Sequence, residues 1–232
     1  MNMEIPSEAF AGEAKIESLR VEHTVFYAVL EPEASDAGPP ALLLALHGYG
    51  QASKSFIRNF RWLRDRNILV VAPQGPNQFR WEETGSVGFG WLAEHKPKET
   101  IEDQMTYMRT LFEKLRANYE FDPERIFTLG FSQGTPVAYR VGASDIAKVR
   151  GVIACAGRLP EDVIRRMGTF DEFPVLIVHG RGDESVPMSD AKEAEAVLNE
   201  SGFEVQTHYF DGYHDLPPDQ VDAIVKWIEA QG

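Results

Sequence analysis

The chain has 232 residues, of which 43% are hydrophobic and 25% charged, and this is enough to bury one large core. We therefore expect a single globular domain over residues 1–232. The formal net charge of −13 argues against a nucleic-acid partner, because such partners are bound by dense patches of Lys and Arg.

The first predicted element lies between Ile16 and Leu30, where apolar residues partly alternate and indicate an antiparallel pair at a sheet edge. Further along, short and nearly continuous apolar runs are typical of strands that are covered on both faces. These runs are Ala41–Leu46, Ile68–Ala72, Arg125–Leu129, Val149–Cys155 and Val175–Val178, and a last strand is expected at Glu204–Phe210.

Helical patterns separate these strands. They cover Ser53–Arg66, Thr100–Tyr119, Gln133–Gly142, Glu161–Met167, Asp190–Glu200 and Pro218–Ala230. Strands that alternate with helices predict an α/β fold, with a mostly parallel, doubly wound sheet and helices on both faces. The segment between Ala156 and Phe173 has room only for a short helix and its turns, so we expect no cap domain there.

The longest stretch without clear periodicity runs from Gln74 to Glu99 and is rich in aromatic residues. Such a composition favours an ordered segment that packs over another part of the molecule. We expect Trp81 in the core and Trp91 on the wall of an apolar substrate pocket. The glycine-rich segment 85–90 lacks the Lys of a P-loop and a preceding strand, so we interpret it as a loop.

Polar residues gather where the predicted parallel strands end, which is the edge at which open parallel sheets bind ligands. Ser132 lies in the G-x-S-x-G segment 130–134 directly after a strand, a pattern that can lift a serine hydroxyl above the sheet. Asp183 and His214 follow two later strands, and the turn His47–Gly50 follows the first parallel strand. These residues predict a nucleophile, Ser132, with His214 as its base and Asp183 orienting the imidazole.

Other interpretations stay open. The alternative for Ser132 is an N-cap of the helix that follows, which is the usual role of a serine there. Glu184 and Asp215 are rivals of Asp183 for the orienting carboxylate. Structural roles are expected for His47, which braces its own turn, and for His179 and His208.

With these motifs the chain resembles the phospholipase/carboxylesterase group of α/β-hydrolases, which includes acyl-protein thioesterase-like enzymes. The resemblance spans most of the chain and rests on Leu46–Gly50, Gly130–Gly134, His179-Gly180 with Asp183 and Val186-Pro187, and His214. It implies hydrolysis of a carboxylic ester, with thioester and lysophospholipid variants, through an acyl-serine intermediate and without a cofactor. The expected oxyanion donors are the backbone N–H groups of Tyr49 and Gln133.

The chain departs from the group's pattern at two places. Tyr213 precedes His214 where members often carry Gly, and Thr135-Pro136 follow the pentapeptide where small residues are common. The first departure puts the shape of the pocket in question. The alternative functions are a serine peptidase on the same fold and a non-catalytic binding protein. No peptide-anchoring domain is evident and no triad member is missing, so a hydrolase of esters is preferred.

A metal site is not expected, because the histidines lack a spacing such as H-E-x-x-H and one cysteine cannot begin a zinc cluster. That cysteine, Cys155, lies in an apolar run and is expected to be a buried structural thiol. The N-terminal residues carry no signal-peptide pattern and no run of about 18 apolar residues occurs. We therefore expect a cytoplasmic protein that acts on a small-molecule ester.

Overall fold

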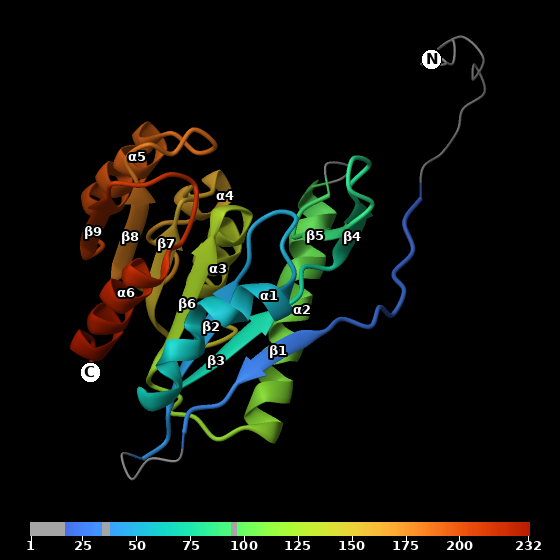
Figure 1. The fold of residues 1–232 in the computed structure, drawn as a ribbon, viewed down its shortest axis with the longest axis horizontal. Coiled ribbons are helices and arrows are strands. Elements are labelled where there is room, and N and C mark those ends of the chain that lie inside the picture. The colour runs from blue at the N-terminus through green and yellow to red at the C-terminus, as the bar shows by residue number, and fades with distance from the viewer. Residues whose placement is uncertain (1–16, 34–37, 94–96) are drawn as a thin grey trace.

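The computed structural model describes residues 17–33, 38–93 and 97–232 (Figure 1). Its main strands are β1 (Tyr27–Leu30), β2 (Ala41–Leu46), β3 (Ile68–Pro73), β6 (Ile126–Phe131), β7 (Val149–Cys155), β8 (Val175–Gly180) and β9 (Val205–Phe210). They form a seven-stranded sheet in the order β1-β3-β2-β6-β7-β8-β9. β1 is antiparallel to β3, and all other neighbours pair in parallel. The predicted mostly parallel sheet is therefore confirmed.

The prediction for the N-terminal segment is only half right. β1 does lie at the sheet edge in an antiparallel ladder, with Tyr27 opposite Pro73. Residues 17–26 form no strand, so the described part of the chain has one strand here and not a pair. The apolar side chains of Leu19 and Val21 stay exposed, and this stretch leads away from the sheet in Figure 1. Alternation without a partner strand is not enough to build a ladder.

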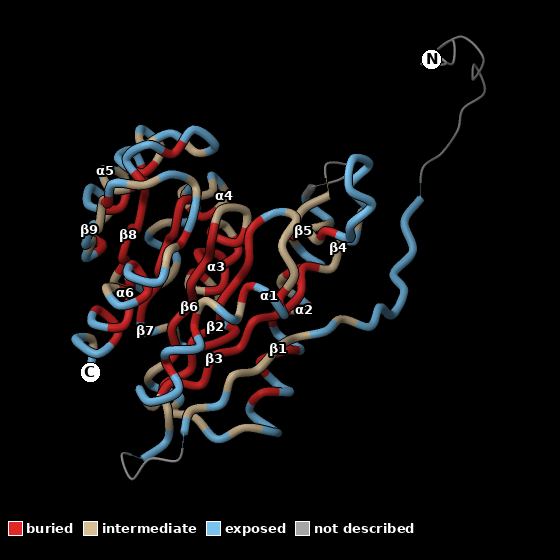
Figure 2. Tube along the Cα trace, in the orientation of Figure 1, coloured by how far each residue is buried: buried red, intermediate tan, exposed pale blue. Residues whose placement is uncertain are grey.

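The central strands are buried because both faces of the sheet are covered, as the continuous red of Figure 2 shows. Successive side chains of a strand point to opposite faces. Leu42 and Leu44 of β2 therefore pack on one side, whereas Leu43 packs on the other. The first side is covered by α2 (Pro97–Asn118), α3 (Thr135–Gly142), α4 (Glu161–Ile164) and α5 (Met188–Glu200), and the second by α1 (Ser53–Phe56), η2 (Ile57–Asp65) and α6 (Pro218–Ala230).

The helix predicted over Ser53–Arg66 is mostly a 3₁₀-helix. Only α1 is α-helical, and η2 continues it as nine residues of 3₁₀-helix. Its buried residues Phe60 and Leu63 are three positions apart, which suits the three residues per turn of a 3₁₀-helix. At the other end of the chain, α6 has the predicted bounds.

The stretch without clear periodicity, residues 74–99, contains a hairpin. β4 (Asn77–Arg80) and β5 (Val87–Gly90) pair antiparallel as a separate two-stranded sheet. The hairpin contradicts the loop assigned to residues 85–90, and the glycines explain the error because they weaken the strand signal. A Cβ at Gly88 would lie 2.7 Å from Cζ of Phe79. Glycine is needed here so that an aromatic ring can pack across the strand.

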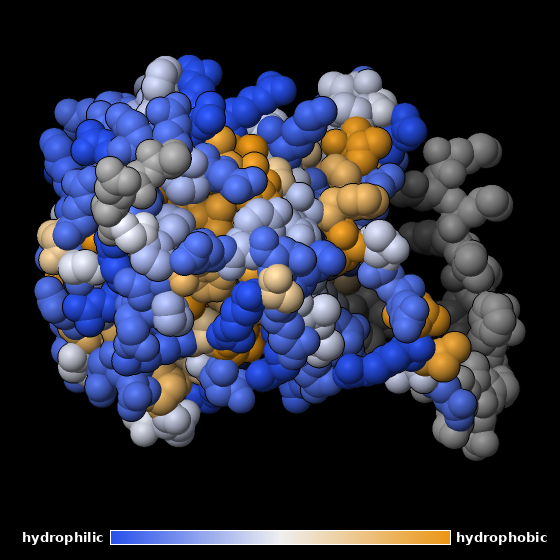
Figure 3. Space-filling model, turned by 90° about the horizontal axis from the view of Figure 1, so that it is seen from below, coloured by the Kyte–Doolittle hydropathy of each residue, from blue (hydrophilic) through white to orange (hydrophobic). Residues whose placement is uncertain are grey.

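Hydrophilic residues cover much of the face shown in Figure 3, with smaller hydrophobic patches between them. This distribution agrees with the acidic composition of the chain. Across residues 17–33, 38–93 and 97–232, none of the helices combines the length and the apolarity that crossing a bilayer requires.

Candidate active site

Ser132 occupies a sharp turn between β6 and α3. Its φ angle is 52°, in the left-handed region that non-glycine residues rarely adopt. A Cβ at Gly130 would lie 2.4 Å from the carbonyl oxygen of Gly134, and a Cβ at Gly134 would lie 2.2 Å from that of Leu46. The two glycines thus let the turn close against itself and against β2. This close packing holds Ser132 in its unfavourable backbone conformation. Strained backbone of this kind is common at functional sites.

The hydroxyl of Ser132 contacts the imidazole of His214. Its Oγ lies 2.9 Å from Nε2 of His214, and Nδ1 of the same ring lies 2.7 Å from Oδ2 of Asp183. Because a carboxylate only accepts, Nδ1–H donates to Asp183, and Nε2 is free to accept the serine proton. Neither η3 (Ser132–Gly134) nor α3 has a side-chain cap, so the N-cap interpretation of Ser132 gains no support.

Asp183 is held by the turn that follows β8. Its Oδ1 accepts hydrogen bonds from the backbone N–H groups of Ser185 at 2.9 Å and Val186 at 2.8 Å. Nε2 of His179, which donates to the carbonyl oxygen of Val186 at 2.9 Å, also lies 3.5 Å from Oδ2. With its side chain fully buried, Asp183 has one oxygen fixed by the turn and the other directed at His214.

The rival residues lie elsewhere. Glu184 and Asp215 are exposed, and the hydrogen bonds of the His214 ring go to Ser132 and Asp183. Nε2 of His208, inside β9, lies 2.5 Å from Oε1 of Gln220 on α6. His208 therefore links a strand to a helix, in agreement with the structural role expected for it.

His47 braces the turn that carries Tyr49. Its Nε2 accepts from the backbone N–H of Gly75 at 2.9 Å and from the side-chain amide of Gln74 at 2.9 Å, so the ring proton is on Nδ1. Nδ1 donates to the carbonyl oxygen of Gly48 at 2.8 Å. Burial lowers the pKa of His47 to about 4, against the opposing effect of the bond to Gly48. The neutral ring thus orients the Gly48–Tyr49 peptide.

The backbone N–H groups of the two expected oxyanion donors, Tyr49 and Gln133, follow the ends of β2 and β6. Within the described residues, the backbone N–H of Tyr49 has no intramolecular acceptor. That of Gln133 lies in the first turn of η3, where N–H groups lack intrahelical acceptors. β2 and β6 are neighbours in the sheet, so both residues follow adjacent strand ends.

The structure contradicts the burial expected for each of the two tryptophans. Trp91 is 0% exposed and lies in the core, so its side chain cannot form the surface of a pocket wall. Trp81, which was expected in the core, is 39% exposed. The glycines before Trp91 suggested an open pocket wall, but Gly88 and Gly90 belong to strand β5 of the hairpin.

The side chain of Gln133 was missed by sequence reasoning, which considered only its backbone. Its Oε1 accepts from the backbone N–H of Trp91 at 2.8 Å, and the indole Nε1 of Trp91 donates to the carbonyl oxygen of His47 at 2.8 Å. These residues are 42 and 44 positions apart in the chain. No local pattern signals such contacts.

Aromatic side chains border the site. The ring of Tyr49 stacks on Phe79 with centroids 4.6 Å apart, and the ring of Trp81 meets Tyr49 edge-on at 5.7 Å. Tyr49 is 53% exposed. Tyr213, which precedes His214 where Gly was expected, is 72% exposed.

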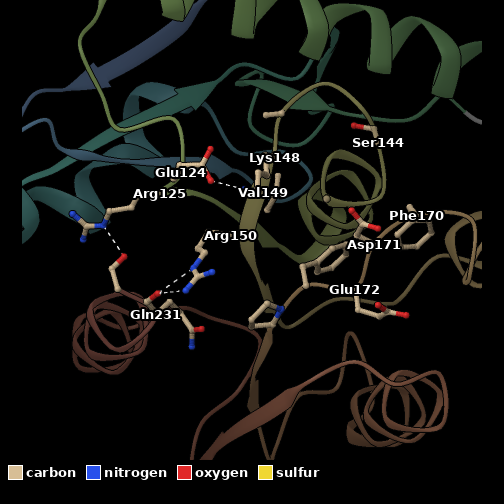
Figure 4. A pocket seen from close by; sticks show the side chains of 15 residues that line it. Glu124, Arg125, Ser144, Lys148, Val149, Arg150, Phe170, Asp171, Glu172 and Gln231 are labelled. Atoms are coloured by element: carbon tan, nitrogen blue, oxygen red, sulfur yellow. Dashed lines mark hydrogen bonds and ion pairs between the residues drawn. The ribbon is translucent and has the colours of Figure 1, made fainter.

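A cavity of about 530 Å³ lies at the opposite end of the strands, near the starts of β6 and β7 (Figure 4). Arg125 and Arg150 point toward the last residues of the chain in this view. Nε of Arg125 donates to the carbonyl oxygen of Gly232 at 2.9 Å, and Arg150 donates to that of Gln231. The cations are thus used to hold the end of α6, and parallel sheets bind ligands at the other edge.

Among the residues that the structure describes, no group of three or more His, Cys, Asp or Glu side chains could hold a metal ion. Cys155 is buried at the end of β7, and burial raises the pKa of its thiol. An uncharged thiol in such a place is a packing residue and a poor nucleophile.

Comparisons with known proteins identify the family of the chain and its fold. A sequence model of the phospholipase/carboxylesterase family matches residues 29–231. Acyl-protein thioesterase 1 of Gibberella zeae is 24% identical over 200 residues, which are 80% of this chain and 85% of that protein. Acyl-protein thioesterase 1 of Saccharomyces cerevisiae is 25% identical over 208 residues, 81% of this chain and 91% of that protein.

Solved structures show the same fold. Esterase PE8 is similar with a TM-score of 0.74 and 22% identity, over 90% of this chain and all 100% of that one. The carboxylesterase of Bacillus cereus has a TM-score of 0.68 and 18% identity, over 90% of this chain and 95% of that one.

Proposed function

The chain belongs to the phospholipase/carboxylesterase family of hydrolases, and from this premise we propose that it is a serine hydrolase that cleaves carboxylic esters through an acyl-serine intermediate. The observation that carries the proposal is the hydrogen-bonded chain from Ser132 through His214 to Asp183. It joins a nucleophile, a base and an orienting carboxylate at one edge of the sheet.

The proposed mechanism has two half-reactions, acylation and deacylation, and in each of them His214 first takes a proton and then gives it up. Oγ of Ser132 attacks the ester carbonyl while Nε2 of His214 takes its proton, and Asp183 stabilises the imidazolium without being protonated. The backbone N–H groups of Tyr49 and Gln133 stabilise the oxyanion. His214 then protonates the leaving oxygen or sulfur. Water, deprotonated by His214, attacks the acyl-serine; the bond between the acyl carbon and Oγ of Ser132 then breaks, the acid leaves, and His214 returns the proton to Oγ.

For the substrate contacts we propose, in place of Trp91, two exposed aromatic residues, Tyr49 and Trp81, and the half-buried Phe79. Tyr49, Phe79 and Trp81 offer an apolar surface next to a proposed oxyanion donor, which suits an acyl or alcohol group of some length. Relatives named acyl-protein thioesterase and structures of esterases favour oxygen esters and thioesters as the substrate class.

The test combines turnover with active-site labelling. Purified protein is incubated with p-nitrophenyl acetate, butyrate and octanoate, with an acyl thioester, and separately with a fluorophosphonate probe. We expect turnover of the esters and covalent labelling of Ser132, and loss of both in Ser132→Ala. A wild-type protein that shows neither turnover nor labelling would be a binding protein, and the proposal would be wrong.

The serine peptidase is the second candidate because it would use the same three residues. Its discriminating measurement is the ratio of kcat/KM for short peptides to that for esters of the same acyl group. Peptides that outperform esters would favour the peptidase. We expect the opposite, since the described residues show an open aromatic border and no added domain that would anchor a peptide.

A further inference from the structure

We propose that Trp91 is a positioning residue that ties together the two halves of the oxyanion hole. Its indole N–H holds the turn that carries Tyr49, and its backbone N–H holds the side chain of Gln133. The inference rests on the proposed function, because it assigns a catalytic consequence to contacts around the proposed oxyanion donors.

The first half of the arrangement fixes two successive peptide planes. The carbonyl oxygen of His47 accepts from Nε1 of Trp91 at 2.8 Å, and the N–H of the same peptide, on Gly48, donates to Oε1 of Gln51 at 2.8 Å. The carbonyl of the next peptide accepts from Nδ1 of His47 at 2.8 Å. The N–H of that second peptide belongs to Tyr49. Its direction is therefore set by the planes before it.

The second half fixes the other donor. Oε1 of Gln133 accepts from the backbone N–H of Trp91 at 2.8 Å. A Cβ at the preceding residue, Gly90, would lie 3.2 Å from this Oε1 and 3.3 Å from the ring of Tyr49. Glycine at this position lets the amide of one donor residue and the ring of the other approach the same point of the hairpin.

Trp91 is itself anchored from the helical layer. Its carbonyl oxygen accepts from the side-chain amide of Gln104 on α2 at 3.1 Å. Nη1 of Arg140 on α3 lies 3.5 Å from Oε1 of Gln104, and the same guanidinium donates to both carboxylate oxygens of Asp162 at 2.8 and 2.9 Å. All three polar groups of Trp91 are thus bonded, and the side chain is 0% exposed.

This placement matters for rate because oxyanion donors act only when they are held in position before the charge develops. A donor that is lost costs about 10²–10³ in kcat, so a donor that is loosened should cost less. We expect Trp91→Phe, which removes the indole N–H and replaces the indole by a smaller aromatic ring, to lower kcat about tenfold and to leave KM within about twofold.

A second variant tests the other half without changing the core. Gln133→Met keeps the backbone donor and the length of the side chain but removes the acceptor for Trp91. We expect a similar loss of kcat. The double variant should lose less than the product of the two single losses, because both contacts meet in one residue.

Trp227 provides the matched control. It is also buried, at 5% exposure, but its Nε1 has no partner in the described part of the structure. Trp227→Phe should leave kcat and KM unchanged. A further measurement distinguishes a positioning role of Trp91 from a purely structural one. An alkyl boronic acid mimics the tetrahedral oxyanion state, so its affinity for Trp91→Phe should fall by the same factor as kcat. The affinity for the carboxylic acid product should not fall.

The outcomes divide clearly. Wild-type kcat and boronate affinity in Trp91→Phe, or a raised KM with unchanged kcat, would overturn the inference. If Trp91→Phe does not fold, Gln133→Met decides by the same criteria. Failure of the proposed function has a different signature, since the wild type itself would then show no ester turnover and no labelling of Ser132.

Discussion

Nδ1 of His47 lies 2.8 Å from the carbonyl oxygen of Gly48, so a buried neutral imidazole holds the peptide that presents the N–H of Tyr49. The ring accepts two further hydrogen bonds at Nε2, and a second proton there would face N–H donors from Gln74 and Gly75. The turn next to the proposed nucleophile is therefore built for one protonation state of one histidine.

The first prediction concerns pH. Burial lowers the pKa of His47 to about 4 from the ordinary 6.5, so the unfolded chain takes up this proton first as the pH falls. The corresponding stability is present above pH 6.5 and is lost between 6.5 and 4, by about 3 kcal/mol in all. An NMR titration of the imidazole nitrogens, assigned with His47→Gln, should show a neutral Nδ1–H ring at pH 5. Titration close to pH 6.5 would contradict this.

The second prediction concerns the serine turn. Gly134→Ala would bring a Cβ within 2.2 Å of the carbonyl oxygen of Leu46, which is backbone and cannot yield easily. We expect a loss of about 3 kcal/mol or more in the free energy of unfolding and an inactive serine. Gly168→Ala is the control, because Gly168 has a φ of 83° and open space around it. It should cost only about 1 kcal/mol. The free energy of unfolding of both variants is measured in urea. Equal losses for Gly134→Ala and Gly168→Ala would argue against the steric explanation.

The third prediction tests the aromatic border. Trp81→Ala should lower kcat/KM about fivefold for p-nitrophenyl octanoate, and much less for the acetate, because about 1 kcal/mol of apolar contact is removed from the longer chain. Trp62 on η2 is a fair control since it is 51% exposed and lies under Arg61, with 4.1 Å from the guanidinium carbon to the ring centre. Trp62→Ala should leave kcat/KM unchanged for both esters. A similar loss for octanoate and acetate in Trp81→Ala would disprove the contact.

The fourth prediction concerns a buried hydroxyl. Tyr139 on α3 is 1% exposed, burial raises the pKa of its phenol, and its oxygen has no partner among the described residues. Tyr139→Phe removes an uncompensated polar group and should raise the free energy of unfolding by about 1 kcal/mol. The hydroxyl of Tyr209, by contrast, donates to Glu195 at 2.7 Å, so Tyr209→Phe should be destabilising. Denaturant unfolding curves in which Tyr139→Phe is destabilising and Tyr209→Phe is stabilising would contradict these hydrogen-bond assignments.

Much of the fold follows from local patterns. The parallel strands were recognisable because each is buried on both faces and therefore reads as a continuous apolar run. The bounds of α6 were predicted because proline marks its start and an apolar stripe runs along it. The N-terminal ladder and the β4–β5 hairpin were harder to predict. The ladder depends on a distant partner strand, and the glycines of β5 weaken the sequence signal of a strand.

The sequence by itself determined that Ser132, Asp183 and His214 each follow the end of a parallel strand, because a parallel sheet gathers these ends at one edge whatever the intervening loops do. Only the tertiary structure decided that Asp183 and not an exposed neighbour contacts the imidazole, that Trp81 faces solvent, and that Trp91 joins His47 to Gln133. Hydrophobic periodicity in the sequence indicates on which face of its own helix or strand a side chain lies. Hydrogen bonds between residues more than 40 positions apart depend on how elements pack, which no local pattern encodes.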